Sequence, residues 1–221
     1  MLEVRVRKKL GDFSLDADFT LERPEISALL GRSGAGKTTL AKMLAGLTRP
    51  DEGRIVFDGR VLFDSSAKCN VPPEGRGVGY VFQEHRLFPH LSVRRNLTFG
   101  QFPGRRKPKE NLAKVVELLK IGHLLDRSPL TLSGGESQRV AIGRALCACS
   151  SFIIMDEPLS SLDAGLKDEI MDYIAMLPRN FSFPIIYITH SMDEVKRLAK
   201  TAAVIAEGRL KSFGTVSAAL R

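Results

Sequence analysis

The most constraining feature of this 221-residue chain is a glycine-rich segment at residues 31–38, Gly-Arg-Ser-Gly-Ala-Gly-Lys-Thr. It matches the pattern Gly-x-x-x-x-Gly-Lys-Ser/Thr, and it lies between an apolar run at 26–30, typical of a buried strand, and a helical pattern at 37–45. Glycines allow the backbone N–H groups of such a loop to converge on phosphate oxygens, and the dipole of the following helix adds positive potential there. The segment therefore predicts a phosphate-binding loop.

The side chains of this loop predict how a nucleotide and a metal ion are bound. The Lys37 ammonium should reach the β- and γ-phosphates, and the Thr38 hydroxyl should bind Mg²⁺. The full predicted ATP-binding set consists of Gly31, Arg32, Ser33, Gly34, Ala35, Gly36, Lys37, Thr38 and Thr39.

A second candidate element is the apolar segment 152–155, which Asp156 and Glu157 follow directly. The segment reads as a strand, and ligands of open α/β sheets lie at the carboxyl ends of strands. Asp156 is expected to hold Mg²⁺ through water, and Glu157 to orient and deprotonate an attacking water. An acidic pair at a strand end is also typical of a solvated turn, but the phosphate loop upstream favours the catalytic interpretation.

A third element, residues 132–139, reads Leu-Ser-Gly-Gly-Glu-Ser-Gln-Arg and predicts a capped helix start. Ser133 suits the N-cap position, and Glu136 three residues later completes a capping box. An exposed Ser-Gly-Gly segment at a helix N-terminus also binds anions. Because the chain already has one phosphate loop, we expect Ser133, Gly134 and Gly135 to contact the nucleotide of another protomer in trans.

Together these three elements resemble the ATP-binding cassette (ABC) family, whose signature motif is similar to residues 132–138. The resemblance runs from about residue 2 to residue 213 and adds further positions. Gln83 resembles the glutamine that senses Mg²⁺ and contacts the membrane partner. Asp163, in a Ser-Leu-Asp segment, resembles the loop residue that crosses the dimer interface in trans. His190 resembles the switch histidine that contacts the γ-phosphate.

The resemblance implies an ATPase that binds Mg-ATP between two cassettes arranged head to tail, as in a homodimer. The catalytic residues that it implies are Lys37, Gln83, Glu157 and His190. The metal ligands that it implies are Thr38, Gln83 and Asp156. The implied partners are membrane-spanning permease subunits and, through them, a solute-binding protein, with the chain peripheral at the cytoplasmic face of the cell membrane. No nucleic-acid partner is expected.

The position that stacks on adenine departs from the pattern of the family. Members usually place an aromatic residue before the phosphate loop, and here that position falls near Leu10, which is aliphatic. Phe13 is the nearest aromatic residue. The expectation is that either Phe13 or no side chain stacks on the base.

The order of strand and helix patterns predicts the fold class. Alternating elements in the second half of the chain indicate a mostly parallel, helix-covered α/β sheet. Residues 2–7 and 13–21 read as strands, and 55–63 as a hairpin with an Asp-Gly turn. Helical spacing of apolar residues between 84 and 128, with breaks at Pro103 and Pro108, predicts a helical insertion. The later elements expected are helices at 135–148, 164–177 and 192–199 and strands at 185–189 and 202–206.

The expected architecture is the P-loop NTPase core of an ABC ATPase, with a parallel-sheet subdomain, an N-terminal antiparallel β subdomain and an inserted helical subdomain. Residues 1–221 are expected to form one domain. Within it, 1–83 and 150–221 make the nucleotide-binding core, and 84–149 make the helical subdomain that carries the signature.

Composition says more about the surroundings in which the chain works than about the reaction it carries out. Lys and Arg exceed Asp and Glu, 33 against 25, for a net charge of +8, which fits a solvated basic surface or attraction to polyphosphate, an anionic membrane or nucleic acid. No apolar run is long enough for a membrane span or a signal peptide. Three cysteines, Cys69, Cys147 and Cys149, do not suit a disulfide framework or a zinc site.

A resemblance to one group within the family suggests which solute is transported. Residues 78–97 are similar to cassettes of bacterial and archaeal importers, and 46–50, 143–146 and 191–194 are most similar to molybdate importer ATPases, with sulfate-type oxyanion importers nearby. Such subunits usually carry a C-terminal regulatory domain, which is expected to be missing from a chain ending at Arg221.

The expected function is ATP-driven import of molybdate or a related oxyanion. The alternatives are an importer for a metal, amino acid or sugar, and a non-transport cassette. A DNA-repair or chromosome cassette would need a long coiled coil between the nucleotide motifs, and 39–131 has no sustained heptads. A cassette protein of translation would usually have two cassettes in one chain, and a small-molecule kinase would not need the signature at 132–138.

Overall fold

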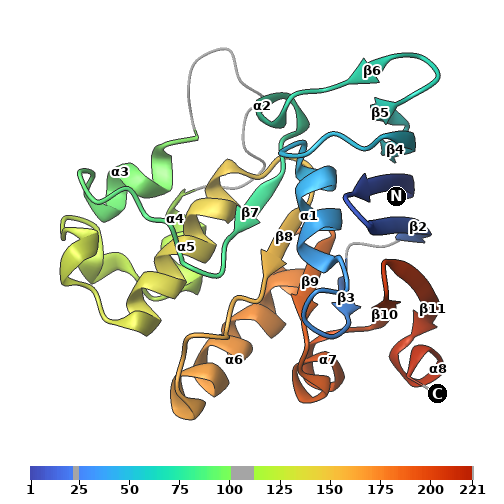
Figure 1. Ribbon diagram of the computed structural model, residues 1–221. Coiled ribbons are helices and arrows are strands. Elements are labelled where there is room, and N and C mark those ends of the chain that lie inside the picture. The colour runs from blue at the N-terminus through green and yellow to red at the C-terminus, as the bar shows by residue number, and fades with distance from the viewer. Residues whose placement is uncertain (22–24, 101–111, 221) are drawn as a thin grey trace. The chain divides into compact units, whose positions relative to one another are not determined.

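The computed structural model describes residues 1–21, 25–100 and 112–220 (Figure 1). The chain divides into two compact units, residues 1–76 with 184–221, and residues 77–183. The breaks expected at Pro103 and Pro108 lie outside the described residues. The predicted helical subdomain at 84–149 was bounded by the positions of sequence motifs, whereas the two units are defined by their compactness. The predicted division therefore stays a prediction.

The strands of the first unit combine an antiparallel part with a parallel part. Their order is β6-β5-β4-β1-β2-β11-β10-β3-β9. The bounds are β1 Leu2–Leu10, β2 Phe13–Leu21, β3 Ile26–Leu30, β4 Glu52–Phe57, β5 Arg60–Asp64, β6 Cys69–Asn70, β9 Ile185–Thr189, β10 Thr201–Ala206 and β11 Arg209–Thr215. Strands β10, β3 and β9 run parallel, whereas β2, β1, β4, β5 and β6 pair antiparallel.

Side-chain patterns explain this split. All five residues of β3 and of β9 are buried, as expected of parallel strands covered on both faces. In β1 and β2 burial alternates, and the outer face carries cross-strand ion pairs from Arg5 to Asp18 and from Arg7 to Asp16. The predicted N-terminal antiparallel part and parallel part are therefore both present.

The helices of the first unit follow or cover these strands. Their bounds are α1 Lys37–Ala45, α2 Pro73–Arg76, α7 Met192–Leu198 and α8 Val216–Ala219. Helix α7 packs on β3 and β9, and α8 on β10 and β11. Their buried contacts join Val195 and Ala219 to Ala28, Leu30 and Ala202 in one apolar cluster.

The second unit joins two parallel strands, β7 Gly79–Val81 and β8 Ile153–Asp156, to a group of helices. The helices are α3 Val93–Thr98, α4 Leu112–Leu118, the 3₁₀ turns Gly122–Leu124 and Pro129–Thr131, α5 Gly134–Ala148 and α6 Ala164–Asn180. Helix α5 contacts α3, α4, α6 and β7 and so lies at the centre of the unit. Short helices thus occupy the described part of the predicted insertion.

Several elements differ from expectation, and β1 extends to Leu10 where the pattern predicted a strand at 2–7. Helix α6 runs through Pro178 to Asn180, although the pattern predicted an end at 177. The Phe181 N–H still donates to the Leu177 carbonyl, so the last turn closes without an N–H from the proline. The tail after 206 also contains a strand, β11, which pairs antiparallel with β10.

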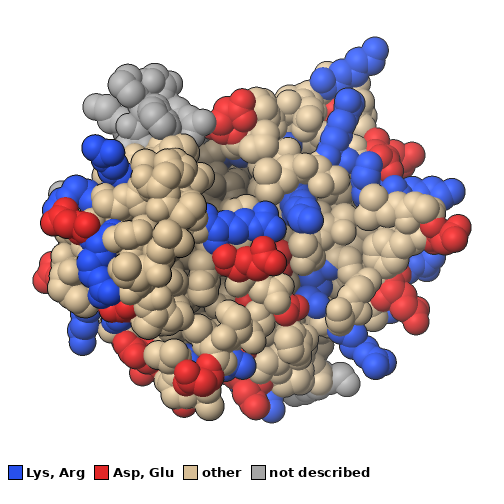
Figure 2. Space-filling model, turned by 60° about the vertical axis from the view of Figure 1, so that its left-hand side comes forward, with Lys and Arg blue, Asp and Glu red and all other residues tan. Residues whose placement is uncertain are grey.

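The surface carries charged side chains of both signs. On the face shown in Figure 2, basic and acidic side chains are interspersed rather than gathered by sign. Within the part of the chain that the structure describes, no helix combines the length and apolarity needed to cross a bilayer.

Candidate active site

The predicted strand–loop–helix context of the phosphate loop is present, since residues 31–36 connect β3 to α1. Gly36 is the N-cap of α1 with φ 104°, a left-handed value that side chains rarely adopt. A Cβ at Gly31 would lie 2.3 Å from the carbonyl oxygen of Ile205. Both glycines are therefore required by backbone conformation or by close packing, and the motif is not an incidental turn.

The Lys37 side chain folds back onto the phosphate loop and bonds to its backbone. It is 5% exposed, and its Nζ donates to the carbonyl oxygens of Gly31 at 2.7 Å and Arg32 at 3.0 Å. Arg32, Ser33, Gly34 and Thr38 are exposed, so the loop presents its backbone to solvent. An ammonium group buried at this position can serve a polyphosphate that lies on the loop.

Phe13, rather than Leu10, lies beside the phosphate loop. The two residues pair across the β1–β2 hairpin, but the Phe13 ring is 3.0 Å from the position of a Cβ built on Gly36 and 3.1 Å from one built on Gly208. Phe13 is partly exposed, and Leu10 is exposed. The contact of Phe13 with adenine stays a prediction, and the position of the ring next to the phosphate loop is compatible with it.

His190 follows β9 directly and is exposed. The turn that carries it is held by Glu194, whose Oε2 accepts hydrogen bonds from Thr189 Oγ1 at 2.7 Å and from the Tyr187 hydroxyl at 2.9 Å. The Ser191 N–H donates to Thr189 Oγ1 at 3.0 Å. Burial, and then the charge of Glu194, raise the pKa of Tyr187, which keeps its hydroxyl a donor.

Sequence reasoning missed Glu194 as a supporting residue. The pattern Ser191-x-x-Glu194 was a signal for it, because it reads as a capping box. Ser191 does cap α7, accepting from the Glu194 N–H at 3.4 Å. The Glu194 carboxylate, however, bonds back to β9 instead of to the Ser191 backbone.

In the second unit the acidic pair lies at the end of β8, as predicted. Asp156 is 8% exposed, and its Oδ2 accepts a hydrogen bond from the Tyr80 hydroxyl at 2.9 Å. Glu157 has φ 47°, a left-handed conformation that costs a non-glycine residue about 1 kcal/mol or more. Ser160 donates to the Glu157 carbonyl through both its N–H and its Oγ. The role of Glu157 toward an attacking water stays a prediction.

Gln83 lies two residues after β7 and is exposed. His85 and Arg86, which follow, have φ values of 53° and 48°. Arg144 of α5 donates to both of their carbonyl oxygens, at 3.0 Å to His85 and 2.7 Å to Arg86. Burial lowers the pKa of Arg144, yet an arginine stays charged at neutral pH. The segment after Gln83 therefore has an unusual backbone held by one guanidinium.

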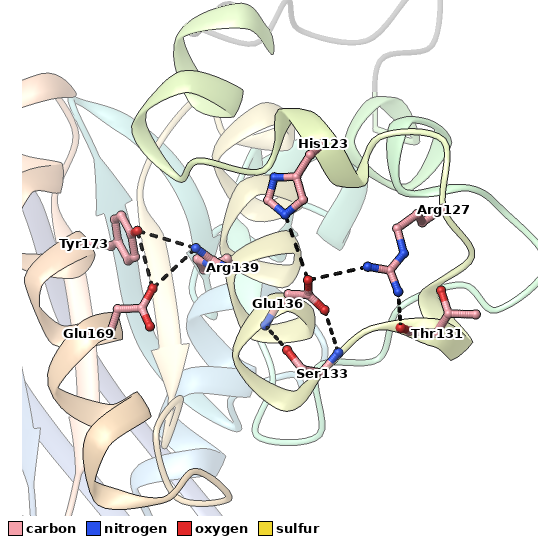
Figure 3. A network of polar contacts seen from close by, with 8 residues as sticks. All are labelled: His123, Arg127, Thr131, Ser133, Glu136, Arg139, Glu169 and Tyr173. Carbon is pink, nitrogen blue, oxygen red and sulfur yellow. Dashed lines mark hydrogen bonds and ion pairs between the residues drawn. The ribbon is translucent and has the colours of Figure 1, made fainter.

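The predicted capping box at the signature is confirmed (Figure 3). Ser133 Oγ accepts from the Glu136 N–H at 3.3 Å, and the Ser133 N–H donates to Glu136 Oε2 at 2.8 Å. Arg127 and His123 lie 3.6 Å and 4.0 Å from Glu136 Oε1. The hydrogen bond from the Ser133 backbone is the largest cause that lowers the pKa of Glu136, so the cap carries a stable negative charge.

The residues expected to act in trans form two neighbouring helix starts. Asp163 is the N-cap of α6, and its Oδ1 accepts from the Leu166 N–H at 3.0 Å. A Cβ at Gly135 would lie 2.9 Å from Leu166 Cδ2, and one at Gly134 would lie 3.6 Å from Leu162 Cδ2. Ser133, Gly134 and Asp163 are exposed, whereas Gly135 is buried against α6. Their contacts with a nucleotide stay a prediction.

The donors expected for Mg²⁺ are an alcohol, an amide and a carboxylate oxygen, from Thr38, Gln83 and Asp156. Magnesium prefers such oxygen donors and usually takes only one or two protein ligands beside water and phosphate. Among the described residues, no three His, Cys, Asp or Glu side chains cluster as an all-protein metal site. By their chemistry these three oxygen donors suit an ion shared with a nucleotide, and its binding by them stays a prediction.

Comparison with known proteins settles the family. The family model described as ABC transporter matches residues 15–160. The chain belongs to the ABC transporter family. The expected fold class is thereby confirmed, and solved cassettes agree with it. At 28% identity, cbiO1 from Clostridium perfringens, part of the ABC transporter complex cbiONQ, covers 99% of this chain and 90% of its own, with a TM-score of 0.83. A nucleotide-free ATP-binding cassette from an ABC transporter is 27% identical over 99% of this chain and 94% of its own, with a TM-score of 0.82.

Curated relatives are more similar in sequence. The molybdenum import ATP-binding protein ModC of Paramagnetospirillum magneticum is 56% identical over 97% of this chain and 59% of its own length. ModC of Rhodospirillum rubrum is 53% identical over all of this chain and 60% of its own. The chain thus spans about three fifths of the length of these relatives.

Proposed function

We propose that this ABC-family chain is the ATP-hydrolysing subunit of an importer for molybdate or a related oxyanion. The observation that most supports the ATPase role is that one chain holds both a phosphate loop at 31–38 and an exposed, capped helix start at Ser133. The first supports binding of a nucleotide, and the second supports contact with the nucleotide of a second copy. The cargo rests on the similarity to two ModC proteins, whose names state molybdenum import.

The hydrolysis reaction assigns a role to each candidate side chain. The loop N–H groups and Lys37 bind the β- and γ-phosphates of ATP, with Phe13 beside the base. Glu157 accepts a proton from water, whose oxygen attacks the γ-phosphorus as the bond to the β–γ bridging oxygen breaks. His190 contacts the γ-phosphate. Mg²⁺, held by Thr38, Gln83 and Asp156, would neutralise phosphate charge.

The partners follow from the shared site. Two copies pair head to tail, and each ATP also meets Ser133, Gly134, Gly135 and Asp163 of the partner protomer. Binding of ATP favours the closed pair, and loss of the γ-phosphate lets it open. Permease subunits receive this motion through the segment after Gln83, which places the chain at the cytoplasmic face of the membrane. A solute-binding protein supplies the anion to the permease.

One experiment tests the proposal. The chain is reconstituted with its permease and binding protein in vesicles, and phosphate release is measured with and without molybdate. Molybdate-loaded binding protein should raise the rate, and Glu157→Gln should lower it at least about a hundredfold while ATP binding persists. Stimulation by another solute instead of molybdate would contradict the cargo, and full turnover by Glu157→Gln would remove Glu157 from the role of base.

A further inference from the structure

Tyr80 contacts the candidate metal carboxylate from the neighbouring strand. It lies in β7, and its hydroxyl donates to Asp156 Oδ2 at 2.9 Å. The strands are parallel, and Tyr80 pairs in register with Ile154. Because side chains two residues apart share a face of a strand, the Tyr80 hydroxyl reaches forward along β8 to the carboxylate at its end.

Packing holds the Tyr80 ring in this position. The Phe82 ring stacks on it with centroids 4.3 Å apart and planes 28° from parallel. The Arg86 guanidinium lies 4.6 Å from the centroid of the Phe82 ring. This row of side chains continues from β7 into the segment that carries Gln83, the other residue of this unit expected to bind the metal.

The chemistry of the two groups fixes the direction of the hydrogen bond. The phenol hydroxyl of Tyr80 carries the proton, and the ionised Asp156 carboxylate can only accept it. Since Asp156 is 8% exposed, few water molecules can replace that donor.

We propose that Tyr80 is a positioning residue that orients the Asp156 carboxylate for Mg²⁺ and ties the end of β8 to the strand that leads to Gln83. This inference rests on the proposed function, in which Asp156 is a metal ligand. In this role Tyr80 acts through the Asp156 carboxylate rather than by contact with the nucleotide or the reacting water. Groups that orient a metal ligand in this way typically contribute 10- to 100-fold to metal affinity.

Manganese binding tests the proposal, since Mn²⁺ replaces Mg²⁺ and is observed by electron paramagnetic resonance. The full chain is saturated with a non-hydrolysable ATP analogue and titrated with Mn²⁺. Tyr80→Phe should weaken Mn²⁺ binding roughly tenfold. Binding of the analogue in EDTA should change less than about twofold, because the hydroxyl acts only through the metal ligand. Tyr173→Phe is the control, since its hydroxyl contacts Glu169 and Arg139 in the same unit.

A double-mutant cycle separates positioning from a general effect on folding. If Tyr80 acts through Asp156, Tyr80→Phe should weaken Mn²⁺ binding no further in an Asp156→Asn background. Should Tyr80→Phe fail to fold, 4-aminophenylalanine and 4-methylphenylalanine at position 80 replace it, because they match in size and only the first donates. The first should bind Mn²⁺ as the wild type does, and the second roughly tenfold more weakly.

The outcomes distinguish this inference from the proposed function. Equal Mn²⁺ affinity of Tyr80→Phe and wild type, or additive effects in the cycle, would overturn the role of Tyr80 alone. If the wild type with nucleotide binds no Mn²⁺, or if Asp156→Asn leaves its affinity unchanged, the metal site of the proposed function is wrong, and the role of Tyr80 with it.

Discussion

At the scale of single residues, Glu194 is the support on which the proposed switch histidine depends. Its Oε2 receives hydrogen bonds from two side chains of β9, those of Tyr187 and Thr189, just before His190. Tyr187 and Thr189 are almost fully buried, so a hydroxyl that lost this acceptor would have little access to water. The end of β9 just before His190 is thus held by a carboxylate that does not itself contact a phosphate in the proposed reaction.

We predict that Glu194→Ala lowers the free energy of unfolding by about 3 kcal/mol, because two buried hydroxyls lose a charged acceptor. It should also lower kcat for ATP roughly tenfold or more with a smaller change in KM, since His190 is misplaced rather than removed. Glu194→Gln, which keeps an acceptor oxygen, is the matched control and should recover most of both losses. Urea unfolding and steady-state phosphate release measure them, and an unchanged kcat in Glu194→Ala would remove Glu194 from this role.

At the scale of elements, helix α5 connects two candidate functional segments within one unit. It begins at the capped signature, and its Arg144 donates to the carbonyls of His85 and Arg86 just after Gln83. Two successive left-handed residues are costly, each by about 1 kcal/mol or more, so this backbone needs an external support. The bidentate guanidinium supplies it, and a lysine at position 144 has no comparable fork.

We predict that Arg144→Lys increases amide hydrogen exchange at residues 83–88 by about tenfold, the result of losing roughly 1.4 kcal/mol of local stability. Arg139→Lys is the control on the same helix, since Arg139 bonds to Glu169 and Tyr173 on α6 instead. Exchange measured by mass spectrometry should rise at 83–88 for the first variant and stay at the wild-type level there for the second. Equal exchange in both variants would show that Arg144 does not hold this segment.

Comparison of two elements, α5 and β11, shows when a sequence pattern is enough to predict an element. The start of α5 was predictable, because Ser133 and Glu136 form a local capping box whose hydrogen bonds span only three residues. Strand β11 was not, since it has no fully buried residue and is stabilised by its pairing with β10. Its one local signal was the turn at Glu207-Gly208, where both residues have left-handed φ values. The helix start was thus predictable from hydrogen bonds within three residues, whereas β11 depends on its pairing with β10 rather than on an apolar pattern of its own.

The same distinction applies to the candidate site. The phosphate loop, the acidic pair and the signature are short motifs, and the chain places each at the strand or helix end expected of it. Tyr80 bonds to a residue 76 positions away in the sequence, and Arg144 to one 58 positions away. No motif or spacing in the sequence predicts these two contacts. Only the fold brings these supporting side chains to the motifs.

At the scale of the whole molecule, the candidate residues divide between the two compact units. The phosphate loop, Phe13 and His190 belong to residues 1–76 with 184–221, and the acidic pair and the signature belong to 77–183. In the proposed pair of cassettes, each ATP uses the loop of one protomer and the signature of the other. Two different defects should therefore complement each other when they lie on different protomers.

We predict such complementation between Ser133→Arg, which blocks the signature, and Lys37→Ala, which disables the phosphate loop. Each variant alone should be nearly inactive, because both sites of its homodimer carry the same defect. In a mixed pair, the loop of the Ser133→Arg protomer meets the intact signature of the Lys37→Ala protomer, and one site of two is complete. Random pairing of an equal mixture should thus restore about a quarter of the wild-type phosphate release. An equal mixture of Ser133→Arg with the double variant Lys37→Ala/Ser133→Arg is the control, since no pair in it contains a complete site. Activity that stays at the level of this control would contradict shared sites, whereas substantial activity of either single variant alone would show that one protomer suffices.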